Sequence, residues 1–391
     1  MCKMKTEITT VCQKNQCAGC MACVDICPKR AILVVDDRRY MNAVIDTSKC
    51  IHCNACHNVC QHNHTALLRE PKEWLQGWGN EKTRATSSSG GFGQAVMRAA
   101  IQHDFVVAAC HLECDDFRFH LIDNEEELEG YTGSKYVKSN PLGIYREVKR
   151  KLVQGRKVLF IGLPCQVSSM RNFMRDHKNL YTIDLICHGS PSIQLLKASL
   201  EEYGYPLSEL EDIHFRNHDK FSITSKPVRI LPKGVQDCYT RAFLRGLCYT
   251  ENCYSCQYAQ SKRVGDITMG DSWGTEMQEE LHKGLSLVLC QTEKGRELLD
   301  MMDFKFLPVD KENSIKQNRQ LRCSSPIPAG REAFFRNMEK GISFNHAVGL
   351  AYPKDYAKQY IKKILINLKL YGGVDKNSYG ITVYSFDKEK L

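Results

Sequence analysis

The stretch CAGCMACVDICP, residues 17–28, has the cysteine spacing C-x2-C-x2-C-x3-C-P. Residues 50–60 read CIHCNACHNVC and repeat that spacing. Three closely spaced thiolates can bind three corners of an iron–sulfur cube, while the fourth cysteine of each run reaches the cube held by the other run. The repeat therefore predicts a small N-terminal domain that folds around two [4Fe–4S] clusters.

The crossed arrangement assigns four cysteines to each cluster. The predicted ligands are Cys17, Cys20, Cys23 and Cys60 for cluster one, and Cys27, Cys50, Cys53 and Cys56 for cluster two. Zinc also binds paired C-x-x-C motifs, but a zinc site does not require three cysteines in register followed by a fourth, twice. The match to bacterial two-cluster ferredoxins covers residues 10–68 and departs at Gln61, where a proline is usual.

The composition of the whole chain favours metal binding in a reducing compartment. The chain has 391 residues and 20 cysteines, and its N-terminus is polar rather than signal-like. No apolar run reaches the roughly 18 residues of a membrane helix, so we expect a cytoplasmic protein. The net charge is +9, yet no nucleic-acid motif is present. An acidic electron-transfer protein or a phosphate-bearing cofactor is therefore a better expectation than nucleic acid.

Changes in composition divide the chain into four segments. We predict a ferredoxin-type domain over residues 1–68, a polar linker over 69–90, a large domain over 91–345 and a basic helical tail over 346–391. Within the large domain, strands are expected at 105–110, 157–162, 182–187, 266–271 and 284–290. Helices are expected at 91–102, 144–153, from about 165, and at 292–300. The predicted fold class is α+β or mixed α/β, with a partly parallel sheet covered by helices.

A second C-x-x-C pair, Cys253 and Cys256, lies far from the ferredoxin motif. Cys165 and Cys187 each follow an apolar strand, at the edge where open α/β sheets bind ligands. These four cysteines together suit a third [4Fe–4S] cluster. On spacing alone two alternatives remain open: Cys165 and Cys187 are buried apolar thiols, or Cys248 is the ligand in place of one of them.

Several motifs follow one another in an order that resembles a known family. They are SSSGG (87–91), GSKYVKS (133–139), GLPCQV (162–167), DLICHGSPS (184–192), CYSCQYA (253–259) and RVGDITMGDSWG (263–274). Over residues 80–340 the chain resembles the family of coenzyme F420 hydrogenase/dehydrogenase beta subunits, in the bacterial form with a two-cluster ferredoxin domain in front. The resemblance implies a flavin, expected to be FAD, beside one [4Fe–4S] cluster. It places the ligands of that cluster at Cys165, Cys187, Cys253 and Cys256, and it needs no cysteine at Cys248.

Candidate flavin contacts come from the resemblance and from the Gly-rich helix start at residues 87–91. Free N–H groups there suit a phosphate, although simple capping by a serine is the alternative. Lys135 and Arg263 are expected to offset pyrophosphate charge, with a solvated surface position as the alternative. His188 is a candidate proton donor or a structural histidine. The predicted flavin-binding residues are Ser88, Ser89, Gly90, Gly91, Gly133, Ser134, Lys135, Tyr136 and Arg263.

The predicted function is that of an iron–sulfur flavoprotein oxidoreductase. Single electrons from a ferredoxin or another electron-transfer protein pass through the clusters to a flavin, which reduces or oxidises an unidentified small molecule. One alternative is a cluster-only adaptor that serves a separate catalytic partner; another, disfavoured by the repeat, is a zinc-stabilised binding protein. Residues 358–373 form a basic amphipathic pattern that we expect to pack on its own domain rather than on a membrane surface.

Overall fold

The computed structural model describes residues 9–226, 228 and 230–370, and its N-terminal part is a small module built from the cysteine repeat. The module contains α1 (Ala22–Ile26), β1 (Ile32–Asp36), β2 (Met41–Ile45) and α2 (Ala55–Val59). The strands form an antiparallel hairpin. Each helix begins after a residue in the left-handed conformation, Met21 at φ 59° and Asn54 at φ 58°. These positions are equivalent in the two repeats, so similar sequences fold in the same way twice.

The large domain is built on one eight-stranded sheet of order β12-β3-β11-β10-β7-β6-β4-β5. The four strands β10, β7, β6 and β4 run parallel, and the outer strands pair antiparallel. The strands are β3 (Glu73–Trp78), β4 (Val106–Glu113), β5 (Asp116–Ile122), β6 (Val158–Gly162), β7 (Leu180–Leu185), β10 (Ile267–Asp271), β11 (Ser286–Cys290) and β12 (Lys305–Pro308). Strand β6 is continuously apolar, and β7 is buried over residues 180–184 with Thr182 and Asp184 as its polar residues. Such burial is expected for parallel strands covered on both faces.

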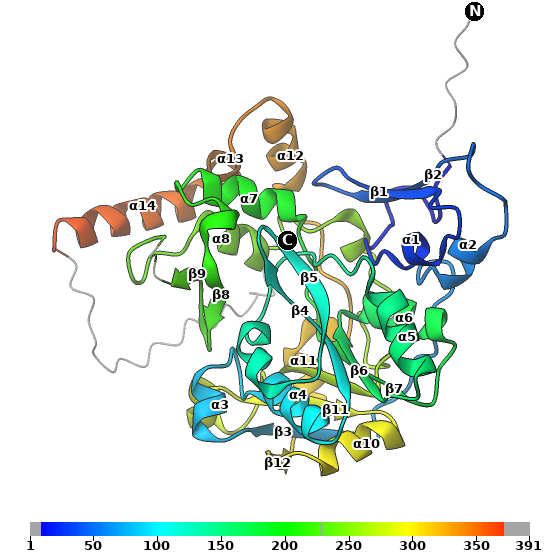
Figure 1. Cartoon of the computed structure of the whole chain (residues 1–391). Coiled ribbons are helices and arrows are strands. Elements are labelled where there is room, and N and C mark those ends of the chain that lie inside the picture. Colours follow the sequence, from blue (N-terminus) through cyan, green and yellow to red (C-terminus); the bar gives the residue numbers. More distant parts are fainter. Residues whose placement is uncertain (1–8, 227, 229, 371–391) are drawn as a thin grey trace, which may run out of the picture.

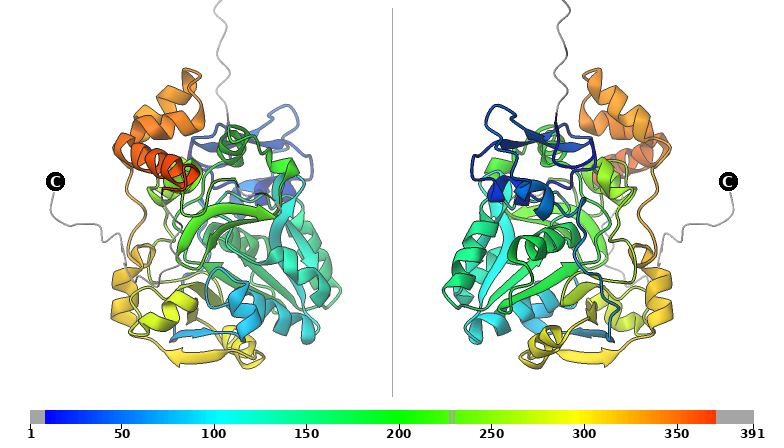
Figure 2. Two further views of the ribbon diagram at one scale, coloured as in Figure 1. Left: turned by 90° about the vertical axis from the view of Figure 1, so that its left-hand side faces the viewer. Right: turned by 90° about the vertical axis from the view of Figure 1, so that its right-hand side faces the viewer.

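Helices cover both faces of this sheet. On one face lie α4 (Phe92–Gln102) and α10 (Glu293–Asp300), and on the other lie α5 (Ile144–Val153) and α6 (Pro164–Met174). Strand β4 shows the alternation, because Val106 and Ala108 pack with α5 and α6 whereas Val107 and Ala109 pack with α4. The N-terminal module shares the α5–α6 core, so it docks on that side of the sheet, as Figures 1 and 2 show.

A further layer of short elements lies beyond the carboxyl ends of the parallel strands. Its hairpin is β8 (Glu211–Asn217) and β9 (Lys220–Lys226), and its helices are α7 (Ile193–Glu201), α8 (Cys238–Leu244), α12 (Arg331–Glu339), α13 (Phe344–Ala351) and α14 (Pro353–Asn367). The remaining helical segments are α3 (Glu81–Ala85), η1 (Glu125–Tyr131), η2 (Leu207–Glu209), η3 (Glu251–Cys253), α9 (Gln278–Lys283), α11 (Lys311–Gln317) and η4 (Arg319–Leu321).

The expected strands and helices of the large domain are present within three residues of their predicted bounds. Residues 69–90, however, are not a linker. This segment contains β3, which pairs with β11 on one side and β12 on the other, followed by α3. Its polar Gln76 is fully buried because its amide bonds to the side chains of Glu276 and Ser272. Buried polar groups that are hydrogen-bonded in this way leave no apolar signal in the sequence.

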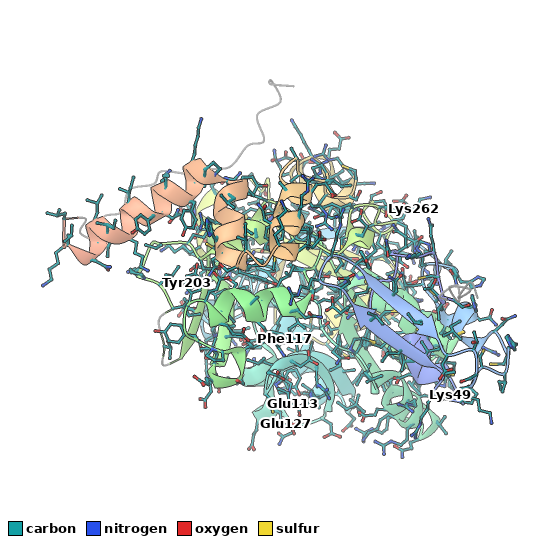
Figure 3. The ribbon with its side chains drawn as sticks, turned by 90° about the horizontal axis from the view of Figure 1, so that it is seen from above. Lys49, Glu113, Phe117, Glu127, Tyr203 and Lys262 are labelled. Carbon is teal, nitrogen blue, oxygen red and sulfur yellow. The ribbon has the colours of Figure 1, made fainter. Side chains whose placement is uncertain are left out.

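The basic amphipathic segment also differs from the expectation. Residues 358–370 of the predicted 358–373 are described, and α14 buries none of its side chains. Tyr360, Ile361 and Leu368 are each more than half exposed. The helix is held at its start, where Asp355 pairs with Arg245, and it projects from the body on the opposite side from Lys49 of the N-terminal module (Figure 3). Across the described residues, no helix is both long and apolar enough to cross a membrane.

Candidate functional site

The structure gathers the four cysteines predicted for cluster one in the core of the N-terminal module. All four are less than 10% exposed. Burial, followed by the nearby Cys17, raises the pKa of Cys20 to about 12. Burial also raises the pKa of Cys23, with contributions from Cys20, Cys17 and Cys60. Cys60 thus lies with the first run of cysteines, as the crossed arrangement requires.

The cysteines predicted for cluster two lie nearer the surface. Cys53 is exposed, and the other three are partly buried. Burial raises the pKa of Cys56, and Cys27 and Cys50 add to the effect, so the last cysteine of the first run lies with the second run. Backbone amides point at sulfur in both runs: Gly19 donates to Cys17 Sγ, and His52 donates to Cys50 Sγ, each at 3.4 Å. Such N–H···S contacts favour thiolate ligands.

A fifth thiol, which the cysteine pattern did not identify, lies beside the ligands of cluster one. Cys12 is buried, and its side chain is hydrogen-bonded to Cys17 and Cys60; these contacts are the largest cause of its raised pKa. The same contact is the main reason that the pKa of Cys60 is lowered to about 6. Because Cys12 lies outside the C-x2-C repeat, spacing gave no signal for it.

The third group of cysteines forms at the carboxyl ends of neighbouring parallel strands. Cys165 follows β6, Cys187 follows β7, and these strands are adjacent in the sheet. Burial raises the pKa of Cys187 to about 12, and Cys253 and Cys256 add to it. Burial likewise raises the pKa of Cys165, with Cys187 and Cys256 among the contributors. The structure thereby brings together the four cysteines that the family resemblance singled out.

Backbone contacts bring the C-x-x-C segment to the loop after β7. The amide of Thr250 donates to Ser190 O at 3.2 Å, and Pro191 forms a bridge with Tyr249. Gly189 has φ +128°, and a Cβ there would lie 2.4 Å from the Tyr249 ring. Only glycine fits this position, because both the backbone angle and the close approach exclude a side chain.

Cys248 belongs to a different environment. Its side chain is fully buried in an apolar core that includes Leu247 and Phe334. Burial raises its pKa to about 12, and the next largest influence is Arg331 rather than another cysteine. Among the described residues, no group of three or more His, Cys, Asp or Glu side chains is close enough to hold a single metal ion. In a cube, by contrast, each thiolate binds a different iron.

The N-terminal module docks directly against the third cysteine group. Tyr145 Oη donates to Cys20 O at 2.6 Å. Gln61, the departure from the ferredoxin pattern, is buried and accepts a 2.7 Å hydrogen bond from Tyr258 Oη, two residues after Cys256. The residue that replaces the usual proline therefore joins the module to the C-x-x-C loop.

Four of the nine predicted flavin-binding residues, Ser88, Ser89, Ser134 and Tyr136, gather around the ion pair of Arg216 and Asp271. Ser88 Oγ accepts a 2.8 Å hydrogen bond from the amide of Ser134. Ser88 O accepts from the Arg216 guanidinium, which also binds Asp271 at 2.7 Å. Ser89 and Arg216 are hydrogen-bonded to Asp271, and with the nearby His188 they hold the pKa of Asp271 below its usual value despite burial.

Tyr136 lies in the same assembly. Burial raises its pKa, and Arg216, Asp271 and Ser134 are its polar neighbours. Its ring stacks on Phe243 with 4.4 Å between centroids. His188 is exposed, and its charged neighbours are Asp271 and Arg216. His188 therefore lies at the boundary between this assembly and Cys187.

The glycines of the two loops permit close packing. A Cβ on Gly90 would lie 2.3 Å from Gly77 O, and Gly91 and Gly133 have φ of +86° and +79°. The Lys135 ammonium bonds to carbonyls of the residues just before it: Nζ donates to Tyr131 O at 2.9 Å and to Thr132 O at 2.8 Å. Burial lowers its pKa to about 8.

Arg263 lies away from this assembly and has no donor left for a phosphate. Its guanidinium is 2% exposed and pairs with Asp184 at 2.7 Å. The other N–H groups donate to Thr268 Oγ1 and to the carbonyls of Tyr258, Gln260 and Leu185. Because a guanidinium has five N–H groups, all are used within the chain. The structure gives Arg263 the role of joining β7 to the C-x-x-C loop.

Sequence reasoning missed Arg216 and the role of Asp271. Arg216 lies on the β8–β9 hairpin, which was not expected, and a single arginine in a polar segment carries no signal. Asp271 ends β10, which runs parallel to β7, so it reaches the same sheet edge as Cys187. Such an edge is where open α/β sheets bind ligands, and this position was the available clue.

Comparison with known proteins supports this organisation. Residues 16–64 match the 4Fe-4S dicluster domain, and residues 155–313 match the C-terminal domain of coenzyme F420 hydrogenase/dehydrogenase beta subunits. The chain is therefore an iron–sulfur protein of the oxidoreductase type, organised for electron transfer. More closely, it is a relative of the F420 hydrogenase/dehydrogenase beta subunits that carries its own dicluster domain, which confirms the resemblance inferred from the motifs.

Two curated relatives extend beyond the single domains. The chain is 22% identical to one of the subunits of F(420)H(2) dehydrogenase from Methanosarcina mazei, over 76% of this chain and 86% of that protein. It is 20% identical to the coenzyme F420-dependent sulfite reductase of Methanocaldococcus jannaschii, over 90% of this chain but only 54% of that protein. A chain of the F420-reducing [NiFe] hydrogenase complex from Methanosarcina barkeri aligns with 18% identity and a TM-score of 0.46, covering 70% of this chain and 95% of that one.

Proposed function

We propose that this protein is an iron–sulfur flavoprotein oxidoreductase with three [4Fe–4S] clusters. The observation that carries the proposal is the position of the third cysteine group. Cys165 interacts electrostatically with Cys20 of cluster one, and His188, which follows Cys187, has Asp271 and Arg216 as its charged neighbours. When bound, the clusters would carry single electrons and the flavin would supply two-electron chemistry to an organic substrate.

The residues around Arg216 and Asp271 would bind and orient the flavin. The serine and glycine loops at 87–91 and 133–136 offer backbone N–H groups that suit phosphate oxygens. Arg216 supplies buried positive charge whose position is fixed by Asp271. His188 is placed to hold or move a proton between Asp271 and the third cysteine group. Lys135, with a pKa of about 8, is a second basic group at the same loop.

The exposed Cys53 of cluster two suggests where a partner donates electrons. Cys53 is exposed, and Ile51 beside it is 54% exposed, so a ferredoxin or another electron-transfer protein can approach closely. The names of the two relatives make coenzyme F420, a deazaflavin hydride carrier, the first small molecule to test as substrate. The alternative function, an adaptor that contains clusters only, predicts the same iron content but no flavin.

The first test measures flavin and iron in anaerobically purified protein. We expect about one flavin and about twelve irons per chain, since three cubes contain four irons each. Arg216→Met should weaken flavin binding at least tenfold and keep the iron. Arg241→Met is the matched control, because Arg241 is 7% exposed against 6% for Arg216, but bonds to Cys238 on α8. Full iron without flavin, even after reconstitution with FAD or FMN, would favour the adaptor.

A further inference from the structure

Lys138 lies between the cysteines of cluster one and the third cysteine group. Its side chain is 5% exposed, and Nζ donates a 3.1 Å hydrogen bond to Ala18 O, inside the first C-x-x-C loop. The same ammonium interacts electrostatically with Cys17 of cluster one. It also interacts with Cys165, Cys187 and Cys253 of the third group.

Within the described part of the chain, no carboxylate forms an ion pair with this buried ammonium. Among residues 9–226, 228 and 230–370, no ion pair joins Lys138 to an Asp or Glu side chain, although many pairs form elsewhere in the domain. A buried ammonium is costly unless an opposite charge lies close to it. Cubes bound by four thiolates carry net negative charge, so the two clusters would supply the missing counter-charge.

The chain is built to hold Lys138 in this position. Its amide donates to Pro191 O at 2.9 Å, in the loop that follows Cys187. Gln166, which follows Cys165, donates to Ser139 Oγ at 2.9 Å. Both ligand loops of the third group are therefore tied to residues 138–139.

Glycine at position 19 provides the space on the other side. A Cβ there would lie 3.1 Å from Lys138 Cδ and 2.4 Å from Met41 Sδ. The first C-x-x-C loop thus comes close to the lysine side chain because Gly19 carries no side chain.

The segment 133–139 that carries Lys138 also reaches the candidate flavin site. Residues 134, 136 and 138 alternate along it: Ser134 bonds to Ser88, and Tyr136 neighbours Arg216 and Asp271. Two residues further on, Lys138 reaches both cysteine groups. One short segment therefore contacts every site that the proposed electron route uses after cluster two.

We propose that Lys138 is an electrostatic bridge that raises the reduction potentials of cluster one and of the third cluster together; this inference rests on the third cluster of the proposed function. A positive charge beside each cluster stabilises the reduced form, which carries one more negative charge. When both clusters are bound, the step that it would serve is the transfer of one electron between them, with no proton transferred. Because the ammonium lies between donor and acceptor, it compensates the electron's charge before and after the step.

The test is an anaerobic redox titration of the holoprotein followed by electron paramagnetic resonance. In Lys138→Met, both clusters should show a reduced-to-oxidised ratio at least tenfold lower at a fixed solution potential, a shift of about 59 mV for a one-electron couple. Lys138→Arg keeps the charge and should stay within about threefold of the natural protein. Lys340→Met, which removes an exposed lysine at the end of α12, should change neither ratio.

The outcomes separate this inference from the proposed function. Unchanged potentials in Lys138→Met with full iron would overturn it, and so would equal shifts in the Met and Arg variants. If Lys138→Met loses iron, the comparison of Lys138→Arg with the natural protein remains as the test. The bridge requires that Lys138→Arg keeps full iron and the natural potentials, so a shift of either potential in this variant would overturn it. If the natural protein holds no flavin but Lys138→Met lowers the potentials of both clusters, the flavin is contradicted and the bridge is retained.

Discussion

Replacing Asp184 by asparagine removes one charge from a buried ion pair at the end of β7. Asp184 is fully buried and accepts hydrogen bonds from Arg263 and from the amides of Val264 at 3.1 Å and Gly265 at 2.8 Å. In Asp184→Asn, the buried guanidinium of Arg263 loses its counter-charge. The new side chain also has an NH2 group in place of one of the two carboxylate oxygens that accept these hydrogen bonds. Breaking one side of a buried pair costs about 3–5 kcal/mol.

This loss should be visible in thermal unfolding. In domains of this size, each kcal/mol of lost stability lowers the unfolding midpoint by roughly 2–4 °C. The midpoint of the large domain should therefore fall by about 6–20 °C. The pair also joins β7, which leads to Cys187, to the segment after Cys256. Asp184→Asn should therefore lose the third cluster and retain about eight of about twelve irons.

The assay compares the midpoint by anaerobic calorimetry with iron per chain. Glu293→Gln is the control, because Glu293 pairs with Lys72 at the surface and its side chain is 86% exposed; exposed pairs of this kind contribute little, and the midpoint should not change. An Asp184→Asn protein that melts within about 2 °C of the natural chain and keeps all its iron would refute the reasoning.

Two further predictions follow from the loops around the site. Burial lowers the pKa of Lys135 from 10.5 to about 8. Between pH 8 and pH 10.5 the unfolded chain therefore binds a proton at Lys135 that the folded chain lacks. The free energy of unfolding should rise with pH across that window. Lys135→Met should lose this rise in denaturant titrations at pH 7.5, 8.5 and 9.5, and an identical pH dependence would disprove the burial effect. Gly189→Ala should lose the third cluster, because a Cβ would lie 2.4 Å from the Tyr249 ring; retention of about twelve irons would show that the loop adapts.

The N-terminal module could be predicted from sequence because local cysteine spacing determines its fold. The repeated spacing implied the crossed grouping, and the structure places Cys60 with Cys17 and Cys27 with Cys56. The central strands could also be predicted, since parallel strands buried on both faces form largely apolar runs in the sequence. Because Cys165 and Cys187 each follow one of these strands, their proximity at the sheet edge could be predicted as well.

The parts that sequence could not give depend on contacts between distant residues. Residues 69–90 were expected to be a linker because the segment is polar and rich in Gly and Ser. Within it, Gln76 of β3 is buried, and its amide bonds to Glu276 and Ser272. Arg263 was expected at a pyrophosphate because a sequence does not show that partners within the chain use all five of its N–H groups. Arg216 and Lys138 gain their importance from neighbours more than 50 residues away in the chain.

The central claim is that Cys165, Cys187, Cys253 and Cys256 bind one cluster, and a matched pair of variants tests it most directly. Iron per chain should be determined for Cys253→Ala and Cys248→Ala after anaerobic reconstitution. We expect about eight irons in the first and about twelve in the second, because Cys253 lies with the other ligands whereas Cys248 is buried in an apolar core. Equal iron in the two variants would contradict the ligand assignment and the electron route built on it.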